Sequence, residues 1–249
     1  MGFGLFRRKR TVETRATSHV VAGKVVPLRV VENERAKRLT LRIETGGKGL
    51  RVTIPKGLRN TDIEGFLDRH ENWIVTKLSA LPENPVVRHG IRIPVRGKSH
   101  LIVHVPGTRG TASLSEDERG PLLLVYGAAE HLPRRIADFL KKQAREDIGR
   151  LVAKHAATVG RKPKAIRFKD TTSRWGSCTS DGTLSFSWRI MMAPAPVIDY
   201  LVAHEVAHLI EMNHGPNFWT LCEKLCPETR RCKDWLKRNG TALHAIRFN

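Results

Sequence analysis

Apolar and polar residues alternate in the N-terminal half of the chain. In KRLTLRIE, residues 37–44, Leu39, Leu41 and Ile43 share one face, which is the period of a half-buried strand. The strands that such runs predict are residues 24–31, 37–44, 49–55, 86–105 and 121–127. The segment TRGTASLSEDERG has no period and is interpreted as a loop. Residues 19–127 are therefore predicted to form a β-rich N-terminal domain with one helix.

That helix is predicted from a change to helical spacing after residue 60. Thr61 and Glu64 have the T-x-x-E pattern of a capping box, which places the first helical turn there. The apolar residues that then recur on one helical face are Ile63, Phe66, Leu67, Ile74 and Leu78. No internal repeat is evident in the sequence.

Helical periodicity dominates the C-terminal half. The elements predicted there are helices at 133–158, 217–226 and 228–238, strands at 165–170 and 183–190, and a helix introduced by Pro194 and Pro196. Gly160 is expected to end the first of these helices and Gly240 to follow the last. The sequence thus predicts an α+β fold whose second domain covers residues 130–240.

The first 18 residues are basic and lack any apolar period, so residues 1–18 are predicted to be a disordered tail. They also lack the apolar segment of a secretory signal. The whole chain contains no run of about 18 apolar residues, which predicts that it has no membrane span.

Cysteine usage favours a reducing compartment. The cysteines are Cys178, Cys222, Cys226 and Cys232. Four clustered residues are too few for a secreted disulfide scaffold, so a cytoplasmic location is expected. A structural zinc site at the last three is an alternative, but their spacing matches no familiar zinc module.

The net charge of +20 attracts polyanions and gives no information about the fold. The chain carries no zinc finger, basic zipper or aromatic-rich RNA motif, so base-specific recognition is not expected. Nonspecific association with nucleic acid through a basic surface is the partner that the charge supports.

The segment LVAHEVAHLIEMNH, residues 201–214, points to a metal site. Residues four apart lie on one helical face, so His204 and His208 are able to reach one ion. Glu205 is rotated by about 100° from His204 and flanks the ion as a candidate catalytic base. This is the H-E-x-x-H logic of zinc hydrolases.

A catalytic zinc takes three protein ligands and keeps one open position. His214 is the expected third ligand, at the spacing of H-E-x-x-H-x-x-G-x-x-H proteases, with Glu211 where those enzymes have glycine. The chain is expected to reverse at Met212–Asn213, helped by left-handed conformations at Asn213 and Gly215. Glu211 and Glu223 remain rival ligands.

Three segments resemble the YgjP-like metallopeptidases, relatives of the SprT and WLM zinc proteases in the zincin group. They are RWGSC at 174–178, SWRIMMAP at 187–194 and YLVAHEVAHLIEMNHGPNFW at 200–219. The resemblance extends toward the N-terminus from about residue 19. It implies a zincin-like catalytic domain, in which the active-site helix lies beside a small sheet and TLSFSWRI is the edge strand at the cleft. It also implies Zn²⁺ held by His204, His208 and His214, with Glu205 as acid and base.

The expected activity is hydrolysis of peptide bonds in a protein or peptide substrate, with no membrane partner. Arg174, Tyr200 and Asn217 are candidates for stabilising the oxyanion. Two alternatives stay open: a metal-dependent hydrolase of nucleotide phosphoanhydrides, and a nucleic-acid-associated zinc-binding module without catalysis. Glu205 discriminates against the last of these, because a structural zinc site needs no base.

Overall fold

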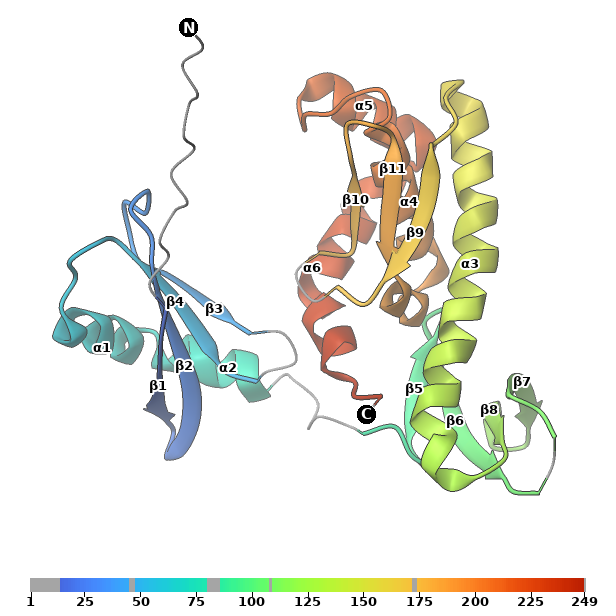
Figure 1. The fold of residues 1–249 in the computed structure, drawn as a ribbon, viewed down its shortest axis with the longest axis horizontal. Coiled ribbons are helices and arrows are strands. Elements are labelled where there is room, and N and C mark those ends of the chain that lie inside the picture. Colours follow the sequence, from blue (N-terminus) through green and yellow to red (C-terminus); the bar gives the residue numbers. More distant parts are fainter. Residues whose placement is uncertain (1–13, 45–47, 80–85, 108, 172–173, 249) are drawn as a thin grey trace, which may run out of the picture. The chain divides into compact units, whose positions relative to one another are not determined.

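The computed structural model describes residues 14–44, 48–79, 86–107, 109–171 and 174–248 (Figure 1). These residues form two compact units that divide between Ser79 and Val86. Both units combine helices with small sheets, which confirms the predicted α+β class. No helix among the described residues is long and apolar enough to cross a membrane.

The first unit is a four-stranded sheet with two helices. Its elements are β1 (Thr14–Val21), β2 (Lys24–Glu32), β3 (Thr40–Ile43), β4 (Leu50–Ile54), α1 (Asn60–Arg69) and α2 (Glu71–Ser79). The strand order is β1-β2-β4-β3, with β2 parallel to β4 and antiparallel pairs at both edges. Buried residues of the sheet pack against Ile63, Leu67 and Ile74 of the helices, so the helices cover one face of the sheet.

Three details of the first unit differ from the prediction. Residues 14–18, expected in the disordered tail, belong to β1 because they pair with β2; residues 1–13 lie outside the described part of the chain. The helix begins at Asn60 after Arg59, without a side-chain cap, so the capping box at Thr61 is wrong. The single predicted helix is two, since α1 ends at Arg69 and α2 begins at Glu71.

The second unit contains a four-stranded sheet, a three-stranded sheet and four α-helices. Its strands are β5 (Arg92–Val95), β6 (Lys98–Val105), β7 (Ala112–Asp117), β8 (Gly120–Tyr126), β9 (Ala165–Lys169), β10 (Gly176–Cys178) and β11 (Thr183–Ser187). Its helices are α3 (Leu132–Val159), α4 (Ala195–Ala207), α5 (Pro216–Leu225) and α6 (Thr229–Ala245), with 3₁₀ turns η2 (Ala129–His131) and η3 (Trp188–Met192). The sheet orders are β5-β6-β8-β7 and β10-β11-β9.

The four-stranded sheets of the two units repeat one topology. In each unit, two β-hairpins are followed by a helix, and the second and fourth strands of the sheet are parallel. The first hairpins turn through two residues with positive φ, Ala22–Gly23 in one sheet and Arg96–Gly97 in the other. This is the backbone of a type I′ turn. Each fourth strand leads to a helix that contains the pattern I-x-x-F-L, at residues 63–67 and 136–140. The fold therefore contains an internal repeat, although none is evident in the sequence.

The boundary between the units lies earlier than the predicted division at residues 127–130. Ile93, Ile102 and Leu123 of the second four-stranded sheet are fully buried in the same core as α3 and α4. The strands β5–β8 therefore belong with the C-terminal helices, although their sequence pattern resembles that of the first unit.

Glycine had the expected effect at one helix end and not at another. Gly160 caps α3 with φ of 68°, as predicted. Helix α6 instead continues through Gly240 to Ala245. A Cβ at residue 240 would lie 2.8 Å from Trp175 Nε1, so this glycine allows a close contact and does not end the helix.

The expected loop before β8 contains β7, which pairs along β8.

A buried polar contact joins α3 to the helix that carries the H-E-x-x-H segment. His155 Nε2 donates to Asp199 Oδ1 over 2.7 Å, and the His155 side chain is only 1% exposed. Burial opposes the charged form of Asp199, but the bond to His155 and the charges of His155 and Lys154 outweigh it and lower the pKa of Asp199 below its usual 3.8.

We expect Asp199→Ala to lower the free energy of unfolding by about 1–3 kcal/mol at pH 7, because His155 is left buried without its acceptor. The contribution of a lowered carboxyl pKa is present above pH 3.8 and is lost as the pH falls through the folded-state pKa. Urea denaturation at pH 7 and pH 3 measures both effects. A difference from wild type that is as large at pH 3 as at pH 7 would contradict the charged interaction.

Candidate metal centre

Helix α4 positions the first two histidines. It begins after Pro194 with a proline in its first turn, as Pro196 predicts, and is buried along most of its length. His204 lies in its last turn, and His208 is its C-terminal capping residue with helical backbone angles of −66° and −13°. The two imidazoles therefore keep the one-turn spacing that the sequence predicts, with ring centroids 5.0 Å apart.

The chain reversal that returns His214 is made differently from the prediction. The backbone leaves α4 through turns at residues 208–210, where Arg161 donates to the Leu209 carbonyl. Gly215 is extended, with φ of −78°, and caps the start of α5. Asn213 is not among the described residues with positive φ. The expected left-handed conformations at Asn213 and Gly215 are therefore wrong, because successive turns reverse the chain without them.

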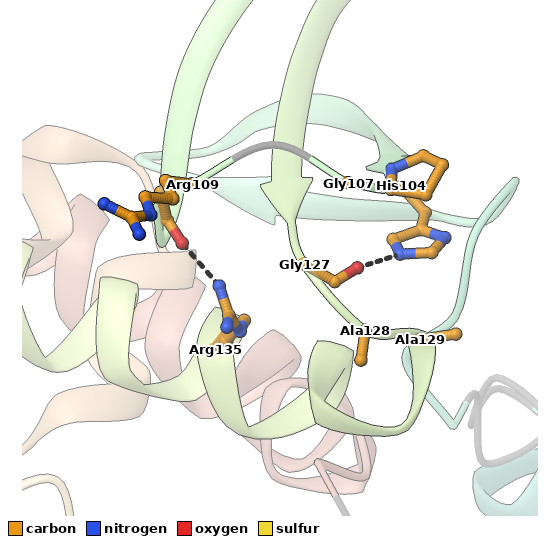
Figure 2. Close-up of a pocket in the computed structure, with 9 residues that line it drawn as sticks. His104, Gly107, Arg109, Gly127, Ala128, Ala129 and Arg135 are labelled. Atoms are coloured by element: carbon orange, nitrogen blue, oxygen red, sulfur yellow. Dashed lines mark hydrogen bonds between the residues drawn. The ribbon is translucent and has the colours of Figure 1, made fainter.

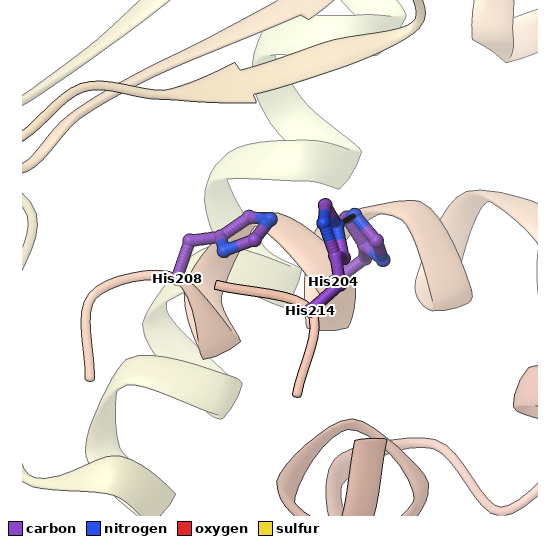
Figure 3. A group of neighbouring side chains, drawn as sticks. All are labelled: His204, His208 and His214. Atoms are coloured by element: carbon purple, nitrogen blue, oxygen red, sulfur yellow. Dashed lines mark hydrogen bonds between the residues drawn. The ribbon is translucent and has the colours of Figure 1, made fainter. Parts of the chain in front are cut away.

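The reversal brings three imidazoles together (Figure 3). His204 Nε2 and His214 Nε2 are 3.1 Å apart, and one ring nitrogen from each of His204, His208 and His214 lies within 4.8 Å of the other two. Among the described residues, this is the group of histidines, cysteines and acids that is able to hold a metal ion. The rivals Glu211 and Glu223 do not belong to it.

A backbone contact orients the His208 ring. His208 Nδ1 lies 2.9 Å from the Glu211 carbonyl oxygen, which only accepts hydrogen bonds, so Nδ1 carries the proton. In the neutral ring, Nε2 is then left with a lone pair for a metal. Such a contact to the second nitrogen is the usual support of a metal-binding histidine. Glu211 thus contributes through its carbonyl and not through its carboxylate.

Burial keeps the ring of His204 neutral. Burial is the largest cause and the neighbouring His208, His214 and Lys233 add to it, so that together they lower the pKa of His204 to about 3. The pKa of His214 is lowered by the same kinds of effect. Neutral imidazole is the form that binds metal. His204 Nδ1 is buried without a hydrogen-bond partner, so this ring lacks the backbone contact that orients His208, and Nε2 is the nitrogen that faces His214.

Two aromatic residues that were not predicted to contact the histidines form a support for them. Phe218 is fully buried, and its ring centroid lies 4.9, 4.5 and 4.7 Å from those of His204, His208 and His214. The ring centroids of Trp219 and His214 are 5.7 Å apart, and the Lys233 ammonium group lies over the Trp219 ring. Proline at the first turn of α5 fixes this helix directly after His214. In the sequence, the signal for this supporting role is that Phe218 and Trp219 closely follow the segment N-H-G-P.

Glu205 lies at the junction of α4 and β10. It is 4% exposed, and burial raises its pKa to about 8 although the charge of Arg174 lowers it in part. Its carboxylate faces the backbone of Gly176, where a Cβ would meet both Cγ and Cδ of Glu205 at 2.7 Å. A base that works near neutrality needs a pKa in this range. Gly176 was not recognised from the sequence as a residue of the site.

The Gly176→Ala variant tests this packing. The new Cβ forces the Glu205 carboxylate to move, while the histidines are untouched. We expect kcat to fall by about 10–100-fold at unchanged metal content, since a misplacement near 1 Å has an effect of that order. Ser177→Ala, on the same strand, is the matched control and is expected to retain activity. Equal activity of the two variants would contradict a fixed carboxylate.

The three oxyanion candidates lie in different surroundings. Arg174 is exposed and close enough to Glu205 to lower its pKa. Tyr200 is buried one turn before His204, with ring centroids 5.9 Å apart, and burial raises the pKa of its hydroxyl. Asn217 is exposed in the first turn of α5, without a hydrogen bond to the other site residues in the described part of the chain. Arg174 is the candidate whose positive charge acts on the buried carboxylate.

The strand beside α4 is not the one expected. TLSFSWRI was predicted as the edge strand, but β11 is central and is hydrogen-bonded to β10 and β9 on its two sides. Its last residues, from Trp188, form a 3₁₀ turn. The strand near Glu205 that lies at an edge of the sheet, among the described residues, is β10 (Gly176–Cys178), in a stretch where no strand was predicted. Three residues are too few to show a period of two.

The cysteines do not form a second metal site in the described residues. Cys222, Cys226 and Cys232 are buried in the core and unpaired. Burial raises the pKa of Cys178 and Glu205 raises it further, which keeps this thiol protonated. The interpretation of the four as reduced thiols therefore agrees with their surroundings.

A separate hollow of about 610 Å³ lies where β6 and β8 end (Figure 2). Two of its side chains bond to backbone carbonyls of the same lining. Arg135 Nη1 donates to the Gly110 carbonyl, and His104 Nε2 donates to the Gly127 carbonyl. The hollow contains none of the predicted site residues, and its side chains do not add to the metal centre.

An H-E-x-x-H helix, a buried glutamate and a third histidine after a chain reversal are together typical of metal-dependent hydrolases. The family described as "YgjP-like, metallopeptidase domain" matches residues 37–239, and the chain belongs to this YgjP-like metallopeptidase family. A search of curated proteins gives no match. The solved structure titled "Crystal structure of the metallopeptidase zymogen of Pyrococcus abyssi abylysin" is 22% identical to the chain. It covers 40% of this chain and 97% of its own, with a TM-score of 0.34.

Proposed function

We propose that the protein is a zinc-dependent peptidase that uses His204, His208 and His214 as metal ligands and Glu205 as the catalytic acid and base. The observation that carries this proposal is the set of three ring nitrogens within 4.8 Å of one another. Helix α4 positions two of them, and its residue after His204 is the buried Glu205. Three neutral imidazoles are a common ligand set of catalytic zinc.

A zinc ion, when bound, supplies Lewis acidity and lowers the pKa of water toward neutrality. The remaining chemistry falls to side chains of this chain. Glu205 accepts the proton of the attacking water and passes it to the nitrogen of the leaving amine. Its raised pKa favours both transfers, because the group gains and loses a proton near neutral pH. Arg174 is the proposed partner of the developing negative charge.

The outer edge of β10 is the proposed binding site for an extended substrate. Among the described residues, β11 pairs with it on one side only, so the backbone groups on the other side are available to a peptide strand. Gly176 belongs to this strand and contacts Glu205, which would place a bound peptide close to the base. Main-chain pairing alone gives little side-chain preference, so a broad range of sequences is expected.

The alternative functions are less well supported. A purely structural zinc site closes its coordination with four protein ligands, whereas the group in the described residues has three. A phosphoanhydride hydrolase of the magnesium type needs oxygen ligands, and the group contains no carboxylate. The four unpaired cysteines support a reducing compartment, and we propose the cytoplasm.

The proposal is tested by incubating the zinc-loaded protein with a peptide library and with a set of nucleotides, and by identifying products by mass spectrometry. We expect new peptide termini that disappear when a chelator removes the metal. Cleavage of nucleotides without cleavage of peptides would overturn the peptidase assignment and favour the phosphoanhydride alternative.

A further inference from the structure

One face of the sheet in the first unit is largely exposed, opposite the face that packs on α1 and α2. Strand pairing places Arg29 of β2 next to Arg51 of β4, and Arg51 directly opposite Arg42 of β3. Neighbouring strands are about 5 Å apart, so the three arginines form one row across the sheet. All three are exposed. We call these residues the arginine row.

This alignment is unfavourable for the isolated protein, because like charges on directly opposite residues destabilise a sheet. One acidic residue offsets it: Glu44 Oε1 lies 3.5 Å from Arg29 Nε. Arg42 and Arg51 form no ion pair or side-chain hydrogen bond within the described residues. Such an exception to the rules of sheet design is expected where a surface has a function.

The internal repeat shows that the topology does not require arginine at these positions. In the second four-stranded sheet, the residues at the same places in the pairing register are Val103, Leu124 and Ser113. The equivalence is fixed by the turns, since Arg29 and Val103 each follow the turn glycine by six residues. The same backbone arrangement therefore exists in this chain with an uncharged row.

The surroundings of the arginine row suit a phosphate backbone. The remaining outward-facing residues of the four described strands are small, aliphatic or hydroxylated, with no aromatic side chain. The acidic residue beside the row is Glu44, which follows β3 directly. Aromatic platforms are what single-stranded nucleic acid uses for base stacking, so their absence from these strands favours a duplex contacted through phosphates.

From these observations we infer that the exposed face of the first sheet binds the phosphate backbone of double-stranded nucleic acid through Arg29, Arg42 and Arg51. The contact is independent of base sequence. Each phosphate contact releases counterions, so affinity falls steeply as salt rises. The inference concerns the first unit and does not depend on the peptidase activity proposed for the second.

The test uses the full-length protein and a fluorescent DNA duplex of about 20 base pairs, measured by anisotropy from 50 to 200 mM salt. The variant Arg29→Val/Arg42→Ser/Arg51→Leu introduces the residues of the second sheet. We expect its affinity at low salt to fall at least about tenfold. The slope of log K against log salt should fall by about 2.7, at about 0.9 for each of three contacts. Its melting temperature should stay the same or rise, because like charges are removed.

The control variant, Arg35→Ser/Arg69→Ser/Lys77→Ser, removes the same charge from exposed residues outside the sheet and should bind nearly as wild type. Arg51→Leu alone should weaken binding in the same direction by a smaller factor. Equal losses in the row and control variants would overturn the inference. So would an arginine-row variant that loses binding to phosphatidylglycerol vesicles while its affinity for the duplex is unchanged.

Discussion

Replacement of Glu205 by glutamine leaves metal content unchanged and lowers kcat for peptide hydrolysis by about 10²–10⁴-fold, the usual contribution of a general acid–base. Glutamine has the same shape but cannot carry the proton. Glu205 is buried against Gly176 and does not belong to the group of three histidines. Its exchange therefore removes the acid–base group and leaves the proposed metal ligands in place. The measurement combines metal analysis with steady-state kinetics on a peptide identified in the library screen.

Glu223→Gln is the matched control for this variant. Glu223 lies exposed on α5 and outside the metal-binding group, so its exchange should change kcat by less than about twofold. If Glu205→Gln retained wild-type kcat at full metal content, the carboxylate would not be the base, and the proposed mechanism would be wrong.

Replacement of His214 by alanine weakens zinc binding by more than about 100-fold, beyond the 10–100-fold effect typical of the groups that only orient a ligand. His214 supplies one of three grouped nitrogens, and the fold offers no described carboxylate to replace it. Competition with a fluorescent zinc chelator measures the affinity. Activity should fall with metal occupancy and recover in part at high zinc concentration.

His131→Ala is the control, because His131 is exposed and lies outside the group. Glu211→Gln separates the two roles considered for that residue. Since its carbonyl and not its carboxylate contacts His208, this variant should bind zinc nearly as wild type. A loss of zinc in Glu211→Gln with none in His214→Ala would show that the ligand set has been assigned wrongly.

The positions of His204 and Glu205 could be predicted because both follow from the geometry of one helix. Four residues make about one turn, and a buried apolar helix carrying two histidines at that spacing needs no further context. The approach of His214 could be predicted as a distance along the chain. Its route could not, because the turns at 208–210 depend on Arg161, a residue 48 positions from Leu209.

The contribution of β10 could not be predicted, since pairing and not sequence defines a three-residue strand. Gly176 illustrates the difficulty. A glycine in a polar segment is typical of a turn, and only the folded chain shows that its missing Cβ makes room for Glu205. Phe218 is similar: it is an ordinary core residue in the sequence and a contact of all three histidines in the fold.

The charge of the chain predicted a polyanionic partner without a location. Arg29, Arg42 and Arg51 are separated by loops and turns in the sequence, and strand register alone brings them into a row. The repeat that supplies their uncharged counterparts was also hidden, because only the turn glycines and the I-x-x-F-L pattern are shared. The two sheets share their topology, but most of their side chains differ.

X-ray absorption at the zinc edge of the zinc-loaded protein tests the central claim most directly, because it identifies the ligand atoms themselves. The account predicts three imidazole nitrogen ligands at about 2.0–2.1 Å, and two in the His214→Ala variant. Sulfur scattering at about 2.3 Å, which would place the metal on the cysteines, or an unchanged spectrum in the variant, would contradict it.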